Sequence, residues 1–290
     1  MIGNTVKRFL LFLTAVCSIG VPVLTVAADK ALTGEEIVKQ CGIKYAGEDQ
    51  RSKFEVVLRD QQGNEKRSVY LRYWKDYKGV NNIIDKMLLF TEYPPDAQGA
   101  AFMRATYTPD LKKAADQWIY LPVLRKIRRV TIRDQGDSFL NSELTYADIT
   151  PRAIDEDTHK LLDTRELGGM QFYVVESTPK ESRPLYSKRV QWFEKTPNWD
   201  DCAKVRIDYY DLKGSLLKEQ FIKWQRVDGA WLWDRVLVRN VETQHASVFL
   251  LTDAKINTGI TDDIFTERTL RMGPSAIPKL NKKSDSKDSK

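Results

Sequence analysis

Residues 53–74 read KFEVVLRDQQGNEKRSVYLRYW. In the first half, Phe54, Val56 and Leu58 point to one side of an extended chain, which is the pattern of a β-strand with a buried face. The run 62–64 supplies turn residues, and RSVYLRYW then continues as a second strand. The stretch therefore predicts an antiparallel hairpin.

The same unit recurs along the chain. Strand-like segments occur in pairs, and a short turn separates the two members of each pair. The pairs are 86–94 and 100–108, 160–167 and 170–178, 204–211 and 215–224, and 230–242 and 247–256. Asp228-Gly229 is a strong two-residue hairpin signal. No Gly-rich linker divides the meander, and a sheet of many twisted strands tends to curl or close. We expect a mainly β chain with about ten or eleven strands in one curved antiparallel sheet. A capping box at Thr33-Gly34-Glu35-Glu36 predicts one clear helix, running to about Tyr45.

Residues 1–28 have the three parts of a secretory signal peptide. Lys7 and Arg8 are followed by an apolar stretch at 9–24 and by small residues at 26–28, where we expect the cut. A transmembrane anchor is the alternative, but the apolar stretch is shorter than the ~20 residues that a span requires. We therefore expect an exported protein.

The cysteines fit an exported protein. Cys17 follows Val16, where a lipoprotein signal has a small residue, so lipid attachment is not expected. Cys41 and Cys202 remain after cleavage, in a compartment that permits disulfides. A disulfide and two separate thiols both fit the sequence.

The folded body is nearly neutral. Cleavage after residue 28 lowers the formal net charge from +6 to +4, and the segment KLNKKSDSKDSK at the end of the chain holds five lysines and two aspartates. A nucleic-acid-binding protein would present a strongly basic face, so nucleic acid is not an expected partner. Residues 29–272 are predicted to form one domain, and residues 273–290 a flexible basic tail.

Catalytic and metal-binding patterns are weak. His159 and His245 each follow a glutamate at minus three, but both lie beside strand patterns, where positions three apart face opposite ways. Ser138 lies in Gly-Asp-Ser-Phe, which resembles one lipase block but lacks the Asp-x-x-His partner of that class. We therefore expect that the protein has no enzymatic activity, binds no cofactor and has no metal site. A hydrolase that uses Ser138 is a remote alternative.

An aromatic run and a basic run adjoin in WIYLPVLRKIRRV, residues 118–130. Pro122 removes a ladder donor and breaks the strand. The basic side chains fit two interpretations: solvated residues that protect a hydrophobic strand, or cations at the mouth of an apolar trough that contact a lipid headgroup or an acidic docking surface. They are Arg125, Lys126, Arg128 and Arg129.

QWIYLPVLRKIRRV (117–130), followed by GDSFLNSELTYADI (136–149), resembles the signature of the LolA-like outer-membrane lipoprotein-sorting proteins. In that family of periplasmic carriers, a Trp-x-Tyr-Leu-Pro-x-Leu block and an Arg-Arg segment precede a Ser-Phe-x-x-Ser-acidic-x-x-Tyr-x-Asp block. Asn141 stands where glycine is common and Glu143 where aspartate is common, so the loop could differ slightly in shape. The matching residues are Ser138, Phe139, Ser142, Glu143, Tyr146 and Asp148.

The resemblance implies a half-barrel with a few helices covering its concave face, and a hollow that carries lipid or lipoprotein acyl chains through the periplasm towards the outer membrane. It also implies transient membrane contact and a resistance-nodulation-division (RND) type transporter as a partner. A non-carrying adaptor on such an inner-membrane pump is the alternative.

Apolar residues exceed what the expected helices can cover, so part of the sheet is either a cavity wall or ordinary core. The seven tryptophans fit both roles. We expect the cavity wall and its gate to include Met87, Leu89, Met103, Trp118, Tyr120, Phe139, Leu140, Leu144, Phe172 and Trp192. The gate is expected at Phe139, Leu140 and Leu144, because these are apolar residues in a polar loop.

Overall fold

The computed structural model describes residues 31–42 and 44–277. The chain divides into two units, Met1–Ala31 and Leu32–Lys290, and the fold is that of the second. The expected signal peptide, residues 1–28, lies outside the described residues, as does the chain from residue 278 onward. The ordered body continues past residue 272 through a turn at Gly273–Ala276, and Ile277 packs against a core cluster.

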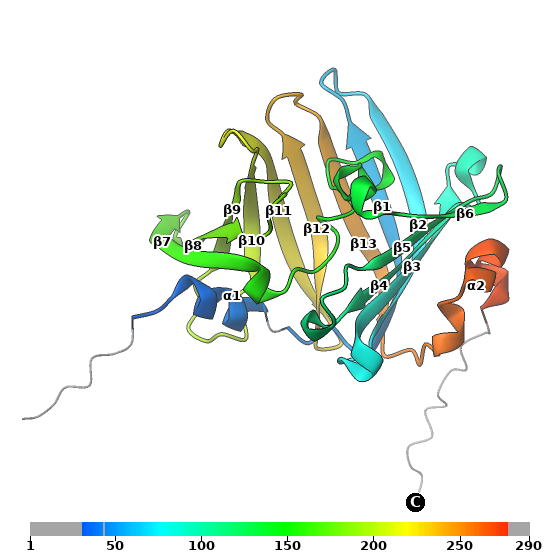
Figure 1. Cartoon of the computed structure of the whole chain (residues 1–290), viewed down its shortest axis with the longest axis horizontal. Coiled ribbons are helices and arrows are strands. Elements are labelled where there is room, and N and C mark those ends of the chain that lie inside the picture. The colour runs from blue at the N-terminus through cyan, green and yellow to red at the C-terminus, as the bar shows by residue number, and fades with distance from the viewer. Residues whose placement is uncertain (1–30, 43, 278–290) are drawn as a thin grey trace, which may run out of the picture. The chain divides into compact units, whose positions relative to one another are not determined.

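Thirteen antiparallel strands form one open sheet within the described residues (Figure 1). Their order across the sheet is β6-β5-β4-β3-β2-β1-β13-β12-β11-β10-β9-β8-β7, so β6 and β7 are its edges. The strands are β1 (Asp49–Arg59), β2 (Glu65–Asp76), β3 (Ile83–Tyr93), β4 (Ala101–Tyr107), β5 (Asp116–Leu121), β6 (Lys126–Arg129), β7 (Asp157–Leu167), β8 (Met170–Pro179), β9 (Lys188–Glu194), β10 (Lys204–Tyr210), β11 (Leu216–Val227), β12 (Ala230–Asn240) and β13 (Ala246–Ile256).

The mainly β fold and the curved antiparallel sheet are confirmed, but the strand number exceeds the expected ten or eleven. Two strands are hard to recognise from hairpin patterns in the sequence. β6 has only four residues, and β9 has loops rather than tight turns on both sides. The predicted first hairpin is β1–β2, in which Phe54 lies opposite Tyr70. Gly63, at φ 87°, makes its turn.

The two faces of the sheet carry different clusters. Strand partners lie on the same face, and successive residues alternate between faces. We call the face with Phe54, Met87 and Leu89 the inner face; it holds the largest core cluster. The outer face of β2 to β4 carries a second cluster, which includes Leu88 and Met103.

The helices cover different faces. α1 (Gly34–Gly42) begins at Thr33, whose Oγ1 accepts a hydrogen bond from Glu36 N at 3.2 Å. It packs on β7 and β8 at one end of the inner face. α2 (Glu267–Met272) packs on β4 from the outer face. The expectation that the helices cover the concave face therefore holds for α1 and fails for α2, because Leu270 is buried among outer-face residues.

Most of the cover on the inner face is irregular chain. Residues 130–156 run from β6 to β7 and pass over the sheet in Figure 1, with short 3₁₀ turns at Ile132–Gly136, Phe139–Asn141 and Ile154–Glu156. We call residues 130–156 the covering segment. It buries Phe139, Leu144 and other apolar residues against the inner-face core. None of the helices in residues 31–42 and 44–277 is long and apolar enough to cross a membrane.

Candidate functional site

A cavity of about 570 Å³ lies between the inner face and the covering segment. Its volume falls within the range of ~300–1,000 Å³ that is usual for ligand pockets. Apolar and aromatic side chains form much of its wall: Phe54, Trp74, Met87, Leu89, Phe139, Leu144, Ile207, Ile222, Trp224, Trp231, Leu232, Trp233, Val236, Phe249 and Leu251. The arrangement provides a large apolar surface for a chain-like ligand.

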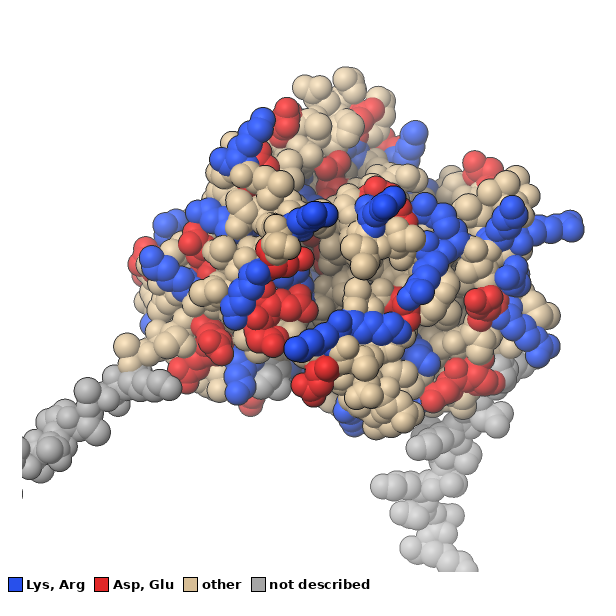
Figure 2. All heavy atoms as spheres, in the orientation of Figure 1, with Lys and Arg blue, Asp and Glu red and all other residues tan. Residues whose placement is uncertain are grey.

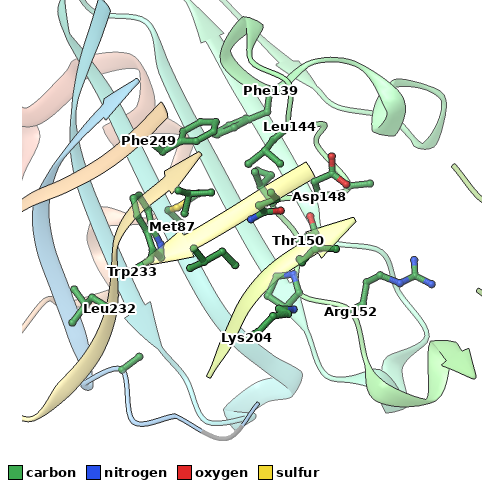
Figure 3. Close-up of a pocket in the computed structure, with 18 of the residues that line it drawn as sticks. Met87, Phe139, Leu144, Asp148, Thr150, Arg152, Lys204, Leu232, Trp233 and Phe249 are labelled. Atoms are coloured by element: carbon green, nitrogen blue, oxygen red, sulfur yellow. The ribbon is translucent and has the colours of Figure 1, made fainter. Parts of the chain in front are cut away.

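The cavity wall also carries charged side chains. In Figure 3, Met87, Phe139 and Trp233 lie toward one side, whereas Arg152 and Lys204 lie toward the other. Charged side chains in the lining are Arg72, Arg104, Asp148, Arg152, Asp157, Arg189 and Lys204. A ligand here would meet both apolar surface and fixed charge.

Aromatic contacts anchor the covering segment to the sheet. The Phe139 ring packs edge-on against Phe102 of β4, with ring centroids 5.1 Å apart, and lies 5.8 Å from the Tyr146 ring. Phe139 is 2% exposed. Aromatic pairs of this kind add stability beyond that of the buried area. Phe139 therefore fixes the position of the segment over the cavity.

Hydroxyl groups of the covering segment shape its turn. Ser138 Oγ donates to the Ser142 carbonyl at 2.5 Å, and Ser142 Oγ donates to the Phe139 carbonyl at 2.6 Å. Leu140 and Asn141 have φ values of 54° and 60°, in the left-handed region. Glycine and asparagine adopt that region most readily, so Asn141 suits this position of the turn.

A buried ion pair ties the segment to β11. Asp148 Oδ2 accepts hydrogen bonds from Lys218 Nζ at 2.6 Å, from the Tyr186 hydroxyl at 3.0 Å and from Thr145 N at 2.8 Å. Burial raises the pKa of Tyr186 well above its ordinary range, and the Asp148 charge adds to this effect. The phenol therefore stays protonated and remains a donor to Asp148.

A second buried pair joins the cavity wall to the segment. Arg104 Nη2 of β4 donates to both carboxylate oxygens of Asp85 of β3, at 2.9 and 3.0 Å, and Arg104 Nη1 donates to the Ile149 carbonyl. Burial by itself would raise the pKa of Asp85. The Arg104 charge and hydrogen bonds, including one from Trp74, lower it by more, so the pKa of Asp85 lies below its ordinary value. Asp85 is therefore ionised at neutral pH.

Comparisons with known proteins place the fold. A family model described only as that of an uncharacterized protein matches residues 84–272. A domain from Vibrio parahaemolyticus assigned to the outer membrane lipoprotein-sorting proteins is 25% identical, with a TM-score of 0.73 over 82% of this chain and 98% of that one. The chain belongs to the family that this model describes, and it is similar in fold to the LolA-like lipoprotein-sorting proteins.

Other solved structures share the LolA-like fold. A DUF1329 family protein from Desulfovibrio piger is 24% identical, with a TM-score of 0.74 over 82% of this chain and 97% of that one. A LolA superfamily protein from Nitrosomonas europaea is 18% identical, with a TM-score of 0.61 over 81% and 98%. Among functionally curated sequences, none matches this LolA-like chain.

The structure brings four of the ten proposed wall or gate residues to the cavity of this LolA-like protein: Met87, Leu89, Phe139 and Leu144. Leu140 packs against the same core cluster but is not part of the lining. Met103, Trp118 and Tyr120 lie on the outer face instead, because Met103 pairs with Leu88 and Trp118 pairs with Met103.

Phe172 and Trp192 also lie away from the cavity. The two rings contact each other, with centroids 6.2 Å apart, and Arg165 and Arg206 lie over the Trp192 ring. On β9 the cavity is lined by Arg189 and Gln191, so Trp192 points to the opposite face. Four tryptophans line the cavity but were not among the ten predicted wall or gate residues, although the high number of tryptophans in the sequence fitted a cavity wall. They are Trp74, Trp224, Trp231 and Trp233.

The basic residues form an exposed edge. The turn after β5 carries Val123 and Leu124, which are 88% and 60% exposed, followed by the exposed Arg125 and Lys126. Arg128 is exposed on β6, an edge strand of the sheet, and its Nη1 lies 4.0 Å from Asp134 Oδ2. We call residues 123–128 the basic tip. Blue side chains are frequent over this edge in Figure 2.

The remaining proposed sites have structural partners. Arg129 pairs with Asp116 of β5. Cys41 of α1 and Cys202 form a disulfide with a Cα–Cα distance of 5.0 Å, which joins α1 to the loop before β10. His159 contacts Ser177 Oγ at 2.8 Å and the Ile154 carbonyl at 3.0 Å. In the described part of the chain, no group of three or more His, Cys, Asp or Glu could hold a metal ion.

Proposed function

We propose that this protein is a periplasmic carrier that binds acyl chains of a lipid or lipoprotein in its cavity and shuttles them towards the outer membrane. The cavity carries the proposal, because its wall is largely apolar and a covering segment lies over it. Burial of apolar surface is worth about 25 cal/mol per Å², so an acyl chain can be held without specific polar contacts. The sorting role named for the Vibrio relative points the same way.

The proposal includes export and the limits of the domain. Residues 1–28 act as a signal peptide that is removed, and the chain from residue 29 forms the carrier body. Phe139 and Leu144 form the wall that moves when cargo enters or leaves, since both belong to the covering segment and line the cavity. The protein is not an enzyme: Ser138 Oγ donates to a carbonyl within its own turn, which is a structural role.

The basic tip provides contact with an acceptor. Its exposed apolar pair, Val123 and Leu124, lies beside exposed cations, which suits an anionic membrane surface or an acidic face of an RND-type transporter. A non-carrying adaptor would dock on such a pump through the same tip, but its cavity would contain no lipid. The presence or absence of bound lipid therefore distinguishes the carrier from the adaptor.

Mass spectrometry of the organic extract tests the carrier directly. The protein is purified gently from the periplasm beside two variants, Met87→Trp, which narrows the cavity, and Met170→Trp, at the exposed first residue of β8. Lipid should be recovered from the wild type and from Met170→Trp, and should be reduced in Met87→Trp. A wild-type extract without lipid, from protein that also fails to bind an added acyl probe, would contradict the carrier and favour the adaptor.

A further inference from the structure

Within the described residues, two cations of the cavity wall form no ion pair. Arg72 of β2 is 7% exposed, and its hydrogen bonds run from Nη1 to Gln50 Oε1 at 2.7 Å and to Ser52 Oγ at 3.5 Å. Lys204 of β10 donates to Gln191 Oε1 at 3.1 Å. Among residues 31–42 and 44–277, neither cation has a carboxylate within 4.0 Å. Both side chains line the cavity.

The other cations of the lining are neutralised within the protein. Arg104 pairs with Asp85 at 2.9 Å. Arg152 and Arg189 share Asp157, at 2.9 and 2.6 Å. The protein therefore pairs these cavity cations and leaves Arg72 and Lys204 with amide and hydroxyl oxygens alone.

Such an arrangement is unfavourable without a ligand. A buried charge loses its hydration, and only an opposite charge or several hydrogen bonds can compensate for that loss. Burial and the nearby Arg189 charge lower the pKa of Lys204 to about 8, against the weaker opposing effect of Asp157. Burial and the Arg104 charge lower the pKa of Arg72 to about 10, against the weaker opposing effect of Asp85. At neutral pH both groups still carry their charge, so an anion that enters the cavity would be attracted to them.

We propose that Arg72 and Lys204 each provide a site in the cavity wall for the anionic head, a carboxylate or a phosphate, of an amphiphile whose acyl chain fills the apolar part of the cavity. This inference rests on the proposed carrier function and narrows its cargo. β2 and β10 are separated in the sheet by β1, β13, β12 and β11, so the two cations approach the cavity from different parts of the wall. Arg72 offers a planar fork of donors and Lys204 a compact charge, and both suit carboxylate and phosphate oxygens.

The head-group site distinguishes between classes of cargo. An ionised fatty acid or a phosphate-headed lipid supplies the missing anion. The ester- and amide-linked acyl chains of a lipoprotein bring no charge, so they would leave Arg72 and Lys204 without a partner. The cavity is therefore better matched to a free anionic lipid than to lipoprotein chains.

The test uses the delipidated exported chain and ligands that differ only in the head. Palmitate, hexadecanol and a single-chain phosphatidic acid are titrated at pH 7.5, and binding is followed through the tryptophans of the lining. Wild-type protein should bind palmitate at least about tenfold more tightly than hexadecanol, because the free energy of one hydrogen bond to a charged group corresponds to a factor of about ten or more in the dissociation constant. The phosphatidic acid arm shows whether phosphate is preferred to carboxylate.

Matched variants assign the preference to the two cations. Lys204→Met and Arg72→Met should each reduce the preference for palmitate severalfold without weakening hexadecanol binding. Lys188→Met, on the same strand as the cavity-lining Arg189 but paired with Glu176, should change neither affinity. Because Lys204→Met removes a half-buried charge that forms no ion pair, it should also raise the thermal midpoint of the empty protein by a few degrees.

Each outcome bears on one proposal. A wild-type preference below twofold, or a preference that persists in the Arg72→Met/Lys204→Met double variant, overturns the head-group site and leaves the carrier standing. If the folded wild type binds neither palmitate nor hexadecanol, the carrier itself fails, and the head-group site fails with it. If Arg72→Met does not fold, Lys204→Met alone decides.

Discussion

Lys218 Nζ lies 2.6 Å from Asp148 Oδ2, and the two side chains are only 4% and 2% exposed. Lys218 belongs to β11 and Asp148 to the covering segment, so this pair joins elements that are 70 residues apart in sequence. Lys218 also donates to the Glu143 carbonyl at 2.7 Å. The pair therefore holds the later half of the covering segment on the inner face.

Removal of Asp148 should destabilise the protein strongly. Asp148→Ala leaves the Lys218 charge buried without its partner, and the loss of one member of a buried pair costs about 3–5 kcal/mol. Urea denaturation at pH 7 measures the change. Asp234→Ala is the control, because its partner Lys223 is 75% exposed, and pairs of that kind contribute ~0–1 kcal/mol. Equal effects of the two substitutions would show that the Lys218–Asp148 pair does not hold the segment.

Phe139 should matter more than its neighbour Leu140. Phe139→Ala removes a fully buried ring from the Phe102–Tyr146 contacts and should cost about 3–5 kcal/mol. Leu140→Ala, at a partly buried position, should cost less than about 2 kcal/mol. Both are measured by thermal unfolding, and the release rate of a bound acyl probe should rise in Phe139→Ala. If Leu140→Ala alone accelerated release, the moving wall would be centred on Leu140 instead.

The fold could be predicted because alternation and turn residues are local signals. Phe54 and Val56 alternate as the β1–β2 register requires, and the turn residues mark most hairpins. The face of a distant strand could not be predicted, since it depends on register. Met87 and Met103 look alike in the sequence, but Met103 lies opposite Leu88 and therefore faces outward.

The charged part of the site could not be predicted from the sequence. Arg72 and Lys204 lie in ordinary strand patterns, and nothing local shows that they lack acidic partners. That property appears only when β2 and β10 are brought to one cavity. The apolar residues of the covering segment were found because Phe139 and Leu144 stand out within a polar loop.

The disulfide should stabilise the body by restricting the unfolded chain. Cys41 and Cys202 are 161 residues apart, and closure of a long loop is worth roughly 2–5 kcal/mol. The Cys41→Ser/Cys202→Ser variant should lose that amount in urea denaturation under oxidising conditions. Added reductant should lower the stability of the wild type and leave the variant unchanged. A reductant effect of the same size on both proteins would show that the disulfide is not its origin.

Acid should weaken the protein through Asp85. The folded pKa of Asp85 lies below the ordinary 3.8, so its contribution is complete above about pH 4 and is lost as the pH falls through the folded value. Asp85→Asn should lower stability at pH 7, because Arg104 loses its ionic partner, and should flatten the decline between pH 4 and 2. Asp253→Asn, in an exposed pair with Lys53, should behave as the wild type does. An unchanged acid slope in Asp85→Asn would place the acid sensitivity elsewhere.

The basic tip should bind anionic membranes. Each Lys or Arg near such a surface contributes ~1 kcal/mol, and the exposed Val123 and Leu124 add apolar contact. The variant Arg125→Gln/Lys126→Gln/Arg128→Gln should therefore lose most co-sedimentation with vesicles of phosphatidylcholine and phosphatidylglycerol. Arg129 is left in place, because it already pairs with Asp116.

Vesicles of phosphatidylcholine alone should bind the wild type weakly, and added salt should reduce binding to the anionic vesicles, because exposed charges are screened within about 10 Å at 0.1 M salt. Lys223→Gln, which removes an exposed charge on β11, is the matched control and should bind as the wild type does. If the triple variant binds anionic vesicles normally but no longer passes its lipid to membranes that contain the transporter, the tip contacts a protein rather than lipid headgroups.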